Sequence, residues 1–144
     1  MAKYRMRGRT DQSPDEVFDF MADLGNFPDW DPGTSSAEQV TGDGPGVGAS
    51  YVLDASNQKF TYTVKTYDRV ARKVVAEAPK SWVTSQDTIT VAPDGDGSVV
   101  TYEAILTLAG ALKLGDPILQ LLFNRIGGKA ADGLVEHFKG TRLE

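Results

Sequence analysis

The side chains with the clearest chemical potential in this 144-residue chain are one aspartate and three tyrosines. Asp87, Tyr51, Tyr62 and Tyr102 stand in stretches where apolar and polar residues alternate, and the period of two places them on the inner face of a sheet. A buried tyrosine usually directs its hydroxyl to a partner, and a buried carboxylate without a partner is costly. These four residues are therefore candidates to hold the polar end of a mostly apolar ligand.

Two other arrangements of these polar groups remain open. The tyrosines and the aspartate could hydrogen-bond one another or reach the rim of the sheet, without any ligand. A bulge near Trp82 would instead turn Asp87 outward and bring Gln86 inward.

Other common chemistries are poorly supported by the sequence. There is no cysteine, which excludes a thiol nucleophile, a disulfide and a zinc–thiolate site. His137 is the single histidine, and in the last turn of a helix it is more typical of a charge at the helix C-terminus or a partly packed residue than of an acid/base catalyst. The glycine-rich residues 42–48 lack the Lys-Ser/Thr and helix of a phosphate-binding loop. We expect no metal and no cofactor.

The elements that must position the candidates are mainly strands. Turn-forming residues separate short alternating segments, and such short connections predict antiparallel neighbours. The expected strands are residues 3–10, 35–41, 49–54, 59–67, 73–78, 81–92 and 98–108. Many of their inward residues are small, which indicates either a close approach of a helix or retained volume.

Two helices complete the expected fold. Ser13 and Glu16 form a capping box, and Pro14 begins a short helix that we expect to end near Asp23. Residues 111–138 predict a long amphipathic helix against the sheet, and Pro117 indicates that its regular part begins at Asp116. Its apolar stripe comprises Leu112, Leu114, Ile118, Leu119, Leu122, Ile126, Ala130, Leu134 and His137.

Length and composition predict one soluble domain over residues 1–142. Leu143 and Glu144 are typical of a cloning remnant. The formal net charge of −5 disfavours nucleic-acid binding, and no apolar run is long enough to span a bilayer. We expect a cytoplasmic monomer or weak homodimer without stable membrane insertion, because the N-terminal residues also lack a secretory signal.

Several motifs resemble one known family. Residues 13–23 (SPDEVFDFMAD), 30–33 (WDPG), 87–90 (DTIT), 116–120 (DPILQ) and 123–127 (FNRIG) are similar to segments of the polyketide cyclase/dehydrase and lipid-transport branch of the START-like (SRPBCC, Bet v 1-like) superfamily. The resemblance implies an α+β helix-grip fold. In that fold a curved, seven-stranded antiparallel sheet wraps around a long C-terminal helix, with one or two short helices between strands 1 and 2. It also implies a hydrophobic cavity between sheet and helix.

The first functional hypothesis is noncatalytic binding or carriage of a lipid, isoprenoid or polyketide-like molecule in that cavity. We expect Leu119, Leu122 and Ile126 to seal the sheet, and space for the ligand near Ala130 and Gly133. The expected ligand-binding residues are Tyr51, Phe60, Tyr62, Ala76, Ser85, Asp87, Ile89, Tyr102, Ala104, Leu119, Leu122, Ile126 and Ala130. Trp30, Leu112 and Leu114 are the expected gate.

The alternative is an enzyme of the polyketide aromatase/cyclase type. Cyclisation needs a base and stabilisation of an enolate, and Asp87, Tyr62 and Tyr102 are the candidates for these roles. The resemblance implies an inward arginine in many such enzymes. The inner face here offers none, which favours the binding hypothesis. A protein-interaction module with a vestigial cavity is a third possibility.

Overall fold

One antiparallel sheet dominates the computed structural model, which describes residues 1–143. Its strand order is β2-β3-β4-β5-β6-β7-β1-β8. The seven long strands are β1 (Ala2–Thr10), β2 (Thr34–Thr41), β3 (Ser50–Ala55), β4 (Gln58–Asp68), β5 (Lys73–Pro79), β6 (Val83–Asp94) and β7 (Gly97–Leu108). The eighth, β8 (Thr141–Arg142), has two residues. Of the expected cloning remnant, Glu144 lies outside the described residues.

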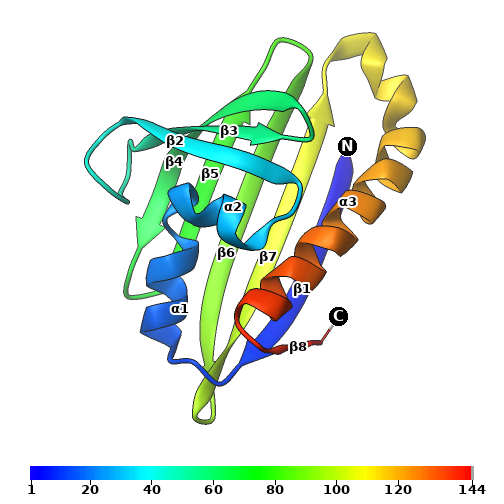
Figure 1. The fold of residues 1–144 in the computed structure, drawn as a ribbon. Helices are drawn as coiled ribbons and strands as arrows, with labels where there is room; N and C mark the ends of the chain where they lie inside the picture. Colours follow the sequence, from blue (N-terminus) through cyan, green and yellow to red (C-terminus); the bar gives the residue numbers. More distant parts are fainter. Residues whose placement is uncertain (144) are drawn as a thin grey trace.

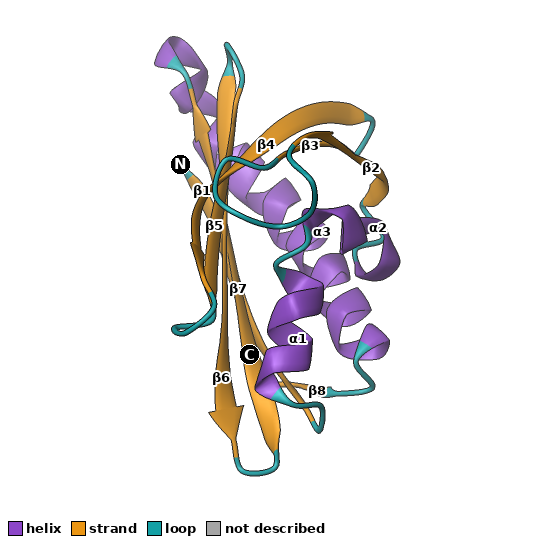
Figure 2. Cartoon of the chain, turned by 90° about the vertical axis from the view of Figure 1, so that its left-hand side faces the viewer, coloured by secondary structure: helices purple, strands orange, loops and turns teal. Residues whose placement is uncertain are grey.

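The helices α1, α2 and most of α3 lie on one face of this sheet, while the turn that precedes α3 lies at the strand ends (Figures 1 and 2). They are α1 (Pro14–Met21), the 3₁₀ turn η1 (Leu24–Asn26), α2 (Phe27–Trp30), the 3₁₀ turn η2 (Gly110–Gly115) and α3 (Asp116–His137). Figure 2 shows β2, β3 and the end of β4 bending over the helical layer, with α2 beneath them. The expected α+β fold with a long C-terminal helix is confirmed. No helix among the described residues is long and apolar enough to cross a bilayer.

The alternation of the strands matches the observed burial. In β6, for example, Val83, Ser85, Asp87, Ile89 and Val91 are buried while the residues between them are not. Asp87 is 5% exposed, so no bulge turns it outward. The pairing of β6 with β5 and β7 places Asp87 opposite Ala76 on one side and Ala104 on the other.

The segment after β1 differs from expectation in one place. The capping box begins α1 as expected, because the Ser13 hydroxyl accepts a hydrogen bond from the Glu16 amide at 3.3 Å. The helix ends at Met21 rather than near Asp23, since the Asp23 carboxylate accepts from the Gly25 amide and starts η1. Residues 27–30 form the short helix α2, a second helix between β1 and β2.

The orientation of α3 corrects the expected apolar stripe. The residues buried beneath the helix are Phe123, Gly127, Ala130, Ala131 and Leu134. Leu122 and Ile126, expected to seal the sheet, are exposed, and Leu119 is only partly buried. The helix is rotated because Gly127 lies directly on the ring of Tyr4, a contact that no larger residue would permit.

A second glycine fixes the other end of the helix. A Cβ at Gly133 would overlap the backbone carbonyl of Trp30, so α2 and α3 touch at this point. Ala130 is buried and Gly133 permits close approach of α2, so the expected ligand space near these two residues does not lie beneath the helix; Gly133 instead borders a hollow on the outside.

The outer edge of β1 is partly paired. β8 bonds with β1 at Gly8 and Arg9. Near the start of β1, the Gln120 side chain accepts from the Lys3 amide at 2.9 Å and donates to the Lys3 carbonyl at 2.8 Å. The side-chain amide of Gln120 thus forms the two hydrogen bonds with Lys3 that a neighbouring strand would otherwise form. These bonds also attach the first turns of α3 to the sheet.

The adjacent glycines of α3 provide a test of this packing. Gly127→Ala should destabilise the fold by about 1–3 kcal/mol, because the added methyl overlaps Tyr4. Gly128→Ala, where nothing lies within 4 Å, should instead stabilise it by about 0.5–1 kcal/mol through higher helix propensity. Urea unfolding of both variants measures the difference. Equal effects would contradict the Gly127–Tyr4 contact.

Candidate functional site

A cavity of about 190 Å³ lies between the sheet and α3. It is bounded by the concave face of β3, β4, β6 and β7, by α2 and the residues that follow it, and by the middle of α3. Its walls are formed by Phe27, Asp31, Thr34, Leu53, Ala55, Ser56, Gln58, Phe60, Tyr62, Asp87, Tyr102, Ala104, Leu106, Phe123 and Ile126. Most of these side chains are apolar, so the few polar groups stand out.

A small residue occupies part of the sheet face at the cavity. Asp87 pairs with Ala104, a wall residue, and with Ala76, which lies outside the wall. A close-packed interior would need a side chain larger than Ala104 to fill this space. Ala104 therefore leaves volume in the cavity, whereas Gly127 and Gly133 of α3 permit close contact with Tyr4 and Trp30.

Asp87 is the central polar group of the cavity. Tyr102 donates a hydrogen bond from its hydroxyl to Asp87 Oδ2 at 2.9 Å. Burial raises the pKa of Asp87 to about 7, against the opposing effect of the Tyr102 hydrogen bond. The carboxyl group thus changes its charge near neutral pH while remaining inside the protein.

Two further polar groups share the wall. The Tyr62 hydroxyl lies 2.6 Å from Ser85 Oγ, and burial raises the pKa values of Tyr62 and Tyr102 well above 10, so both phenols are neutral. Asp31 accepts hydrogen bonds from the Thr34 hydroxyl at 2.8 Å and the Gly33 amide at 2.9 Å. Burial raises the pKa of Asp31 as well, and its charge adds to the rise at Asp87.

The mouth of the cavity lies between the β3–β4 turn and α3. Ser56 and Gln58 are exposed wall residues of that turn, and Ile126, also in the wall, is 41% exposed. Beside them, Lys80 Nζ lies 4.7 Å from the centroid of the Phe60 ring. An apolar molecule would therefore enter past Ile126 and reach Asp87 at the inner end.

Six of the expected ligand-binding residues lie in the cavity wall: Phe60, Tyr62, Asp87, Tyr102, Ala104 and Ile126. Ser85 and Ala76 lie behind it, next to Tyr62 and Asp87. Tyr51 pairs with Tyr62 across β3 and β4 but lies outside the cavity wall, with Asp23 and Tyr67 as electrostatic neighbours. The remaining expected residues outside the wall are Ile89, Leu119, Leu122 and Ala130.

Several wall residues were missed in the sequence. Asp31 belongs to the WDPG motif at residues 30–33. This short segment has no strand or helix periodicity, so the sequence gave no sign that the Asp31 side chain would face inward. Phe123 was overlooked because the expected stripe ran through Leu119, Leu122 and Ile126. Its spacing of four residues from Gly127 was the available signal.

The expected gate residues lie in two different places. Leu112 and Leu114 belong to η2 and are exposed, outside the cavity wall. Trp30 is 3% exposed and packs edge-on against Tyr102, with ring centroids 5.5 Å apart. Trp30 therefore contacts a cavity residue, whereas Leu112 and Leu114 lie outside the cavity wall.

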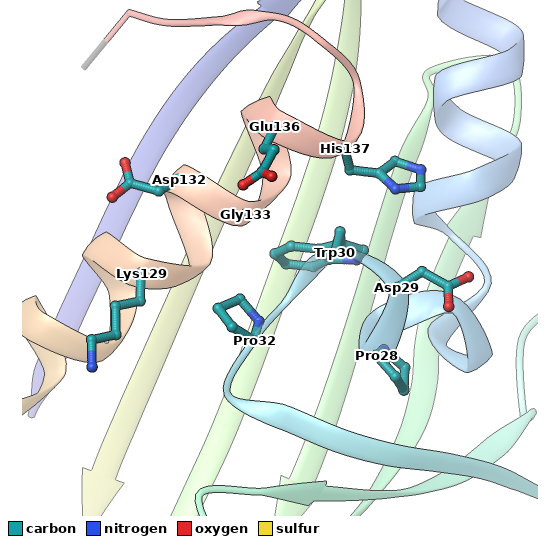
Figure 3. A pocket seen from close by; sticks show the side chains of 9 residues that line it. All are labelled: Pro28, Asp29, Trp30, Pro32, Lys129, Asp132, Gly133, Glu136 and His137. Carbon is teal, nitrogen blue, oxygen red and sulfur yellow. The ribbon is translucent and has the colours of Figure 1, made fainter.

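A second, wider hollow of about 610 Å³ lies outside, between α2 and the last turns of α3 (Figure 3). Figure 3 shows the Trp30 ring at its floor and charged side chains around it: Asp29, Lys129, Asp132 and Glu136. His137 borders it and stacks on Phe20 at 4.4 Å, as a packed residue would. Trp30 thus separates this hollow from the internal cavity. We favour the cavity as the site because its walls are apolar and enclose the polar groups.

Comparison with known proteins agrees with this architecture. The sequence matches the family model described as polyketide cyclase / dehydrase and lipid transport over residues 1–139. No match was found among curated protein sequences.

Solved structures with low sequence identity share the fold. The di-domain ARO/CYC BexL from the BE-7585A biosynthetic pathway aligns with a TM-score of 0.76 at 16% identity, over 96% of this chain and 47% of BexL. The chain therefore spans about half the length of that protein. A START superfamily protein from Mycobacterium smegmatis gives 0.70 at 13% identity, over 95% and 94% of the two chains. Major latex-like protein 151 from Panax ginseng gives 0.71 at 12%, over 95% and 97%.

The buried carboxyl group predicts a specific pH dependence of stability. Asp87 has a pKa of about 7 in the folded protein, compared with about 3.9 in an unfolded chain, so the folded state binds more protons between these values. Stability should fall as pH rises through this window, by up to about 4 kcal/mol at about 1.4 kcal/mol per pKa unit. Asp87→Asn should remove this loss, which urea unfolding at pH 4.5 and pH 8 measures.

The control is Asp96→Asn, which removes an exposed carboxylate from the β6–β7 turn. The free energy of unfolding of Asp87→Asn minus that of the wild type should be larger at pH 8 than at pH 4.5. The same difference for Asp96→Asn should not change between the two pH values. Parallel pH profiles for the wild type and Asp87→Asn would contradict the buried titration.

Proposed function

The chain belongs to the polyketide cyclase/dehydrase and lipid transport family, and from this premise we propose that it binds a small, mostly apolar molecule in the cavity between the sheet and α3. The observation that carries the proposal is an apolar cavity with one hydrogen-bonded carboxyl group, Asp87–Tyr102, in its wall. Ligand sites of this kind combine apolar walls with a few placed polar groups that fix orientation.

The cavity volume limits how much of a ligand can be enclosed. At about 190 Å³ it is smaller than the roughly 300–1,000 Å³ typical of sites for drug-sized ligands. The cavity therefore takes one end of a longer molecule, and the remainder passes Ile126 at the mouth. A lipid, isoprenoid or polyketide-like chain fits this description.

The polar groups define which end goes inward. When ionised, Asp87 accepts a hydrogen bond from a ligand hydroxyl, and when protonated it donates one to a ligand carbonyl. The phenols of Tyr62 and Tyr102 stay neutral across physiological pH. The Tyr102 hydroxyl already donates to Asp87, so it can only accept from a ligand, whereas the Tyr62 hydroxyl can donate to a ligand when Ser85 is the donor in their shared hydrogen bond. We infer a ligand with an oxygen-bearing end directed at Asp87 and an apolar end directed at the mouth.

A cyclase-type activity is the second candidate, favoured by one specific observation. A carboxyl group with a pKa of about 7, enclosed and hydrogen-bonded to a neutral tyrosine, is matched to proton transfer at neutral pH. In this alternative Asp87 removes a proton α to a ligand carbonyl, and Tyr62 donates a hydrogen bond to the enolate oxygen.

Blocking the cavity tests the binding proposal. Ala104→Phe should weaken binding of farnesol, an apolar alcohol, at least about tenfold, because the ring occupies the space beside Asp87. Trp30 emission in a Trp82→Phe background is the readout, since Trp30 contacts the cavity residues Phe27 and Tyr102. Native mass spectrometry of gently purified protein provides an independent search for a bound apolar molecule.

The matched control is Val70→Phe, which adds the same ring at a position that is 93% exposed. If Ala104→Phe fails to fold, Ile126→Phe at the mouth supplies a second blocking variant on an exposed residue and leaves Trp30 as the single tryptophan. Farnesol binding unaffected by both blocking variants would reject the cavity as the site.

The catalytic alternative has its own test. With a synthetic poly-β-keto thioester, Asp87→Asn should lower cyclisation at least about 100-fold, and wild-type turnover should rise with pH through about 7 as the base ionises. Product analysis against buffer alone measures both. Turnover that is unchanged in Asp87→Asn would reject the role of Asp87, and no turnover above buffer would leave binding as the function.

A further inference from the structure

Large apolar side chains gather at the end of the molecule where η2 joins α3. We define the η2–α3 patch as Trp82, Leu112, Leu114, Ile118, Leu121 and Leu122. All six are exposed, Leu114 to 88%. Figures 1 and 2 both show this end of the helical layer beside the β5–β6 turn, beyond the curved part of the sheet.

Four of these residues lie on one side of the helical segment. Leu114, Ile118, Leu121 and Leu122 follow at steps of three and four residues, which places them on one side of η2 and α3. The Trp82 backbone lies beside this segment, because its carbonyl accepts a hydrogen bond from the Ala109 amide immediately before η2. Scattered exposed apolar residues are ordinary, but a contiguous patch marks an interaction surface.

The rest of the described surface has no comparable cluster. Among the residues the structure describes, twelve large apolar side chains are exposed, and the patch together with Ile126 accounts for seven of them. The others are Val40 in β2, Val47 and Val70 in turns, and Met1 and Leu143 near the chain ends.

The charge around the patch is opposite to that of the whole chain. Residues 54–60, 79–82 and 108–126 form this end and carry four basic residues, Lys59, Lys80, Lys113 and Arg125, against two acidic ones. One of the acids, Asp116, is ion-paired with the amine of Met1. The chain as a whole has a formal net charge of −5. The patch is therefore the apolar centre of a basic surface on an acidic protein.

We propose that the η2–α3 patch docks the protein on an anionic lipid surface. Exposed leucines and isoleucine would enter the boundary between headgroups and acyl chains, Trp82 would lie at headgroup level, and Lys113 and Arg125 would face the lipid phosphates. A symmetric contact between two copies is disfavoured, since it would bring the same basic surfaces together.

Docking would also place the cavity mouth at the membrane. Ile126 belongs to the cavity wall and lies one helical turn from Leu122 of the patch. An apolar ligand could then pass between bilayer and cavity without crossing water. This consequence rests on the proposed function, whereas docking itself does not.

Vesicle binding tests the proposal with the full chain. Co-sedimentation with vesicles of phosphatidylglycerol and phosphatidylcholine should show binding that weakens as salt is raised, and vesicles of phosphatidylcholine alone should bind much less. In a Trp30→Phe background, Trp82 emission should shift to shorter wavelength on binding. Absence of sedimentation with the anionic vesicles would overturn the proposal.

Matched variants locate the surface. Leu114→Asp combined with Leu121→Asp should reduce binding at least about tenfold, because both side chains leave the bilayer boundary. Val70→Asp, at a 93% exposed position of the β4–β5 turn, should leave binding unchanged. Equal losses in the two variants would overturn the assignment. Circular dichroism verifies that each variant is folded.

Charge is tested separately. Lys113→Gln with Arg125→Gln should lower the salt dependence of binding, whereas Lys65→Gln with Lys73→Gln, on exposed positions of β4 and β5, should not. Ala104→Phe should bind anionic vesicles like the wild type, which separates docking from failure of the ligand site. A doubled mass in solution that depends on Leu114 would overturn docking in favour of a second copy.

Discussion

The contact between Gly127 of α3 and the ring of Tyr4 determines much of what is distinctive in this molecule. Because Tyr4 occupies the place of a side chain at Gly127, the helix has one permitted rotation over β1. That rotation buries Phe123, Ala130 and Leu134 and turns Leu122 and Ile126 away from the sheet. The position of Ile126 at the cavity mouth and the exposure of Leu122 beside it agree with this rotation, which the contact of Gly133 with Trp30 also fixes.

The fold holds Asp87 in an unfavourable environment. A carboxyl group between Ala76 and Ala104 has one side-chain hydrogen bond, from Tyr102, and its ionisation is opposed by burial. An apolar residue at this position would pack the sheet better and avoid the desolvation cost. Residues that oppose stability in this way are concentrated at functional sites, which supports the cavity as the place where the protein acts.

The sheet could be predicted from the sequence in detail, whereas the helix could not. Alternation over residues such as Val83 to Val91 specifies the inner face, so Asp87, Tyr62 and Tyr102 were correctly expected to point inward. Residues 111–138 contain apolar side chains around most of the helix, so periodicity alone allowed more than one buried face. Gly127 and Gly133 mark the buried face of the helix. That face can be recognised only when the positions of Tyr4 and Trp30, which contact the two glycines, are known. Asp31 could not be placed, because its orientation depends on the tertiary position of α2.

The paired hydrogen bonds between Gln120 and the backbone of Lys3 give α3 two different modes of attachment along its length. Its C-terminal half is held by buried side chains, while its first turns are held mainly by a few exposed polar bonds. Local opening of the first turns exposes little additional apolar surface, so it requires less free energy than unfolding of the domain. The first turns of α3 are thus the part of the helix that should open most readily, and they lead directly into the turn of Phe123 and Ile126 at the cavity.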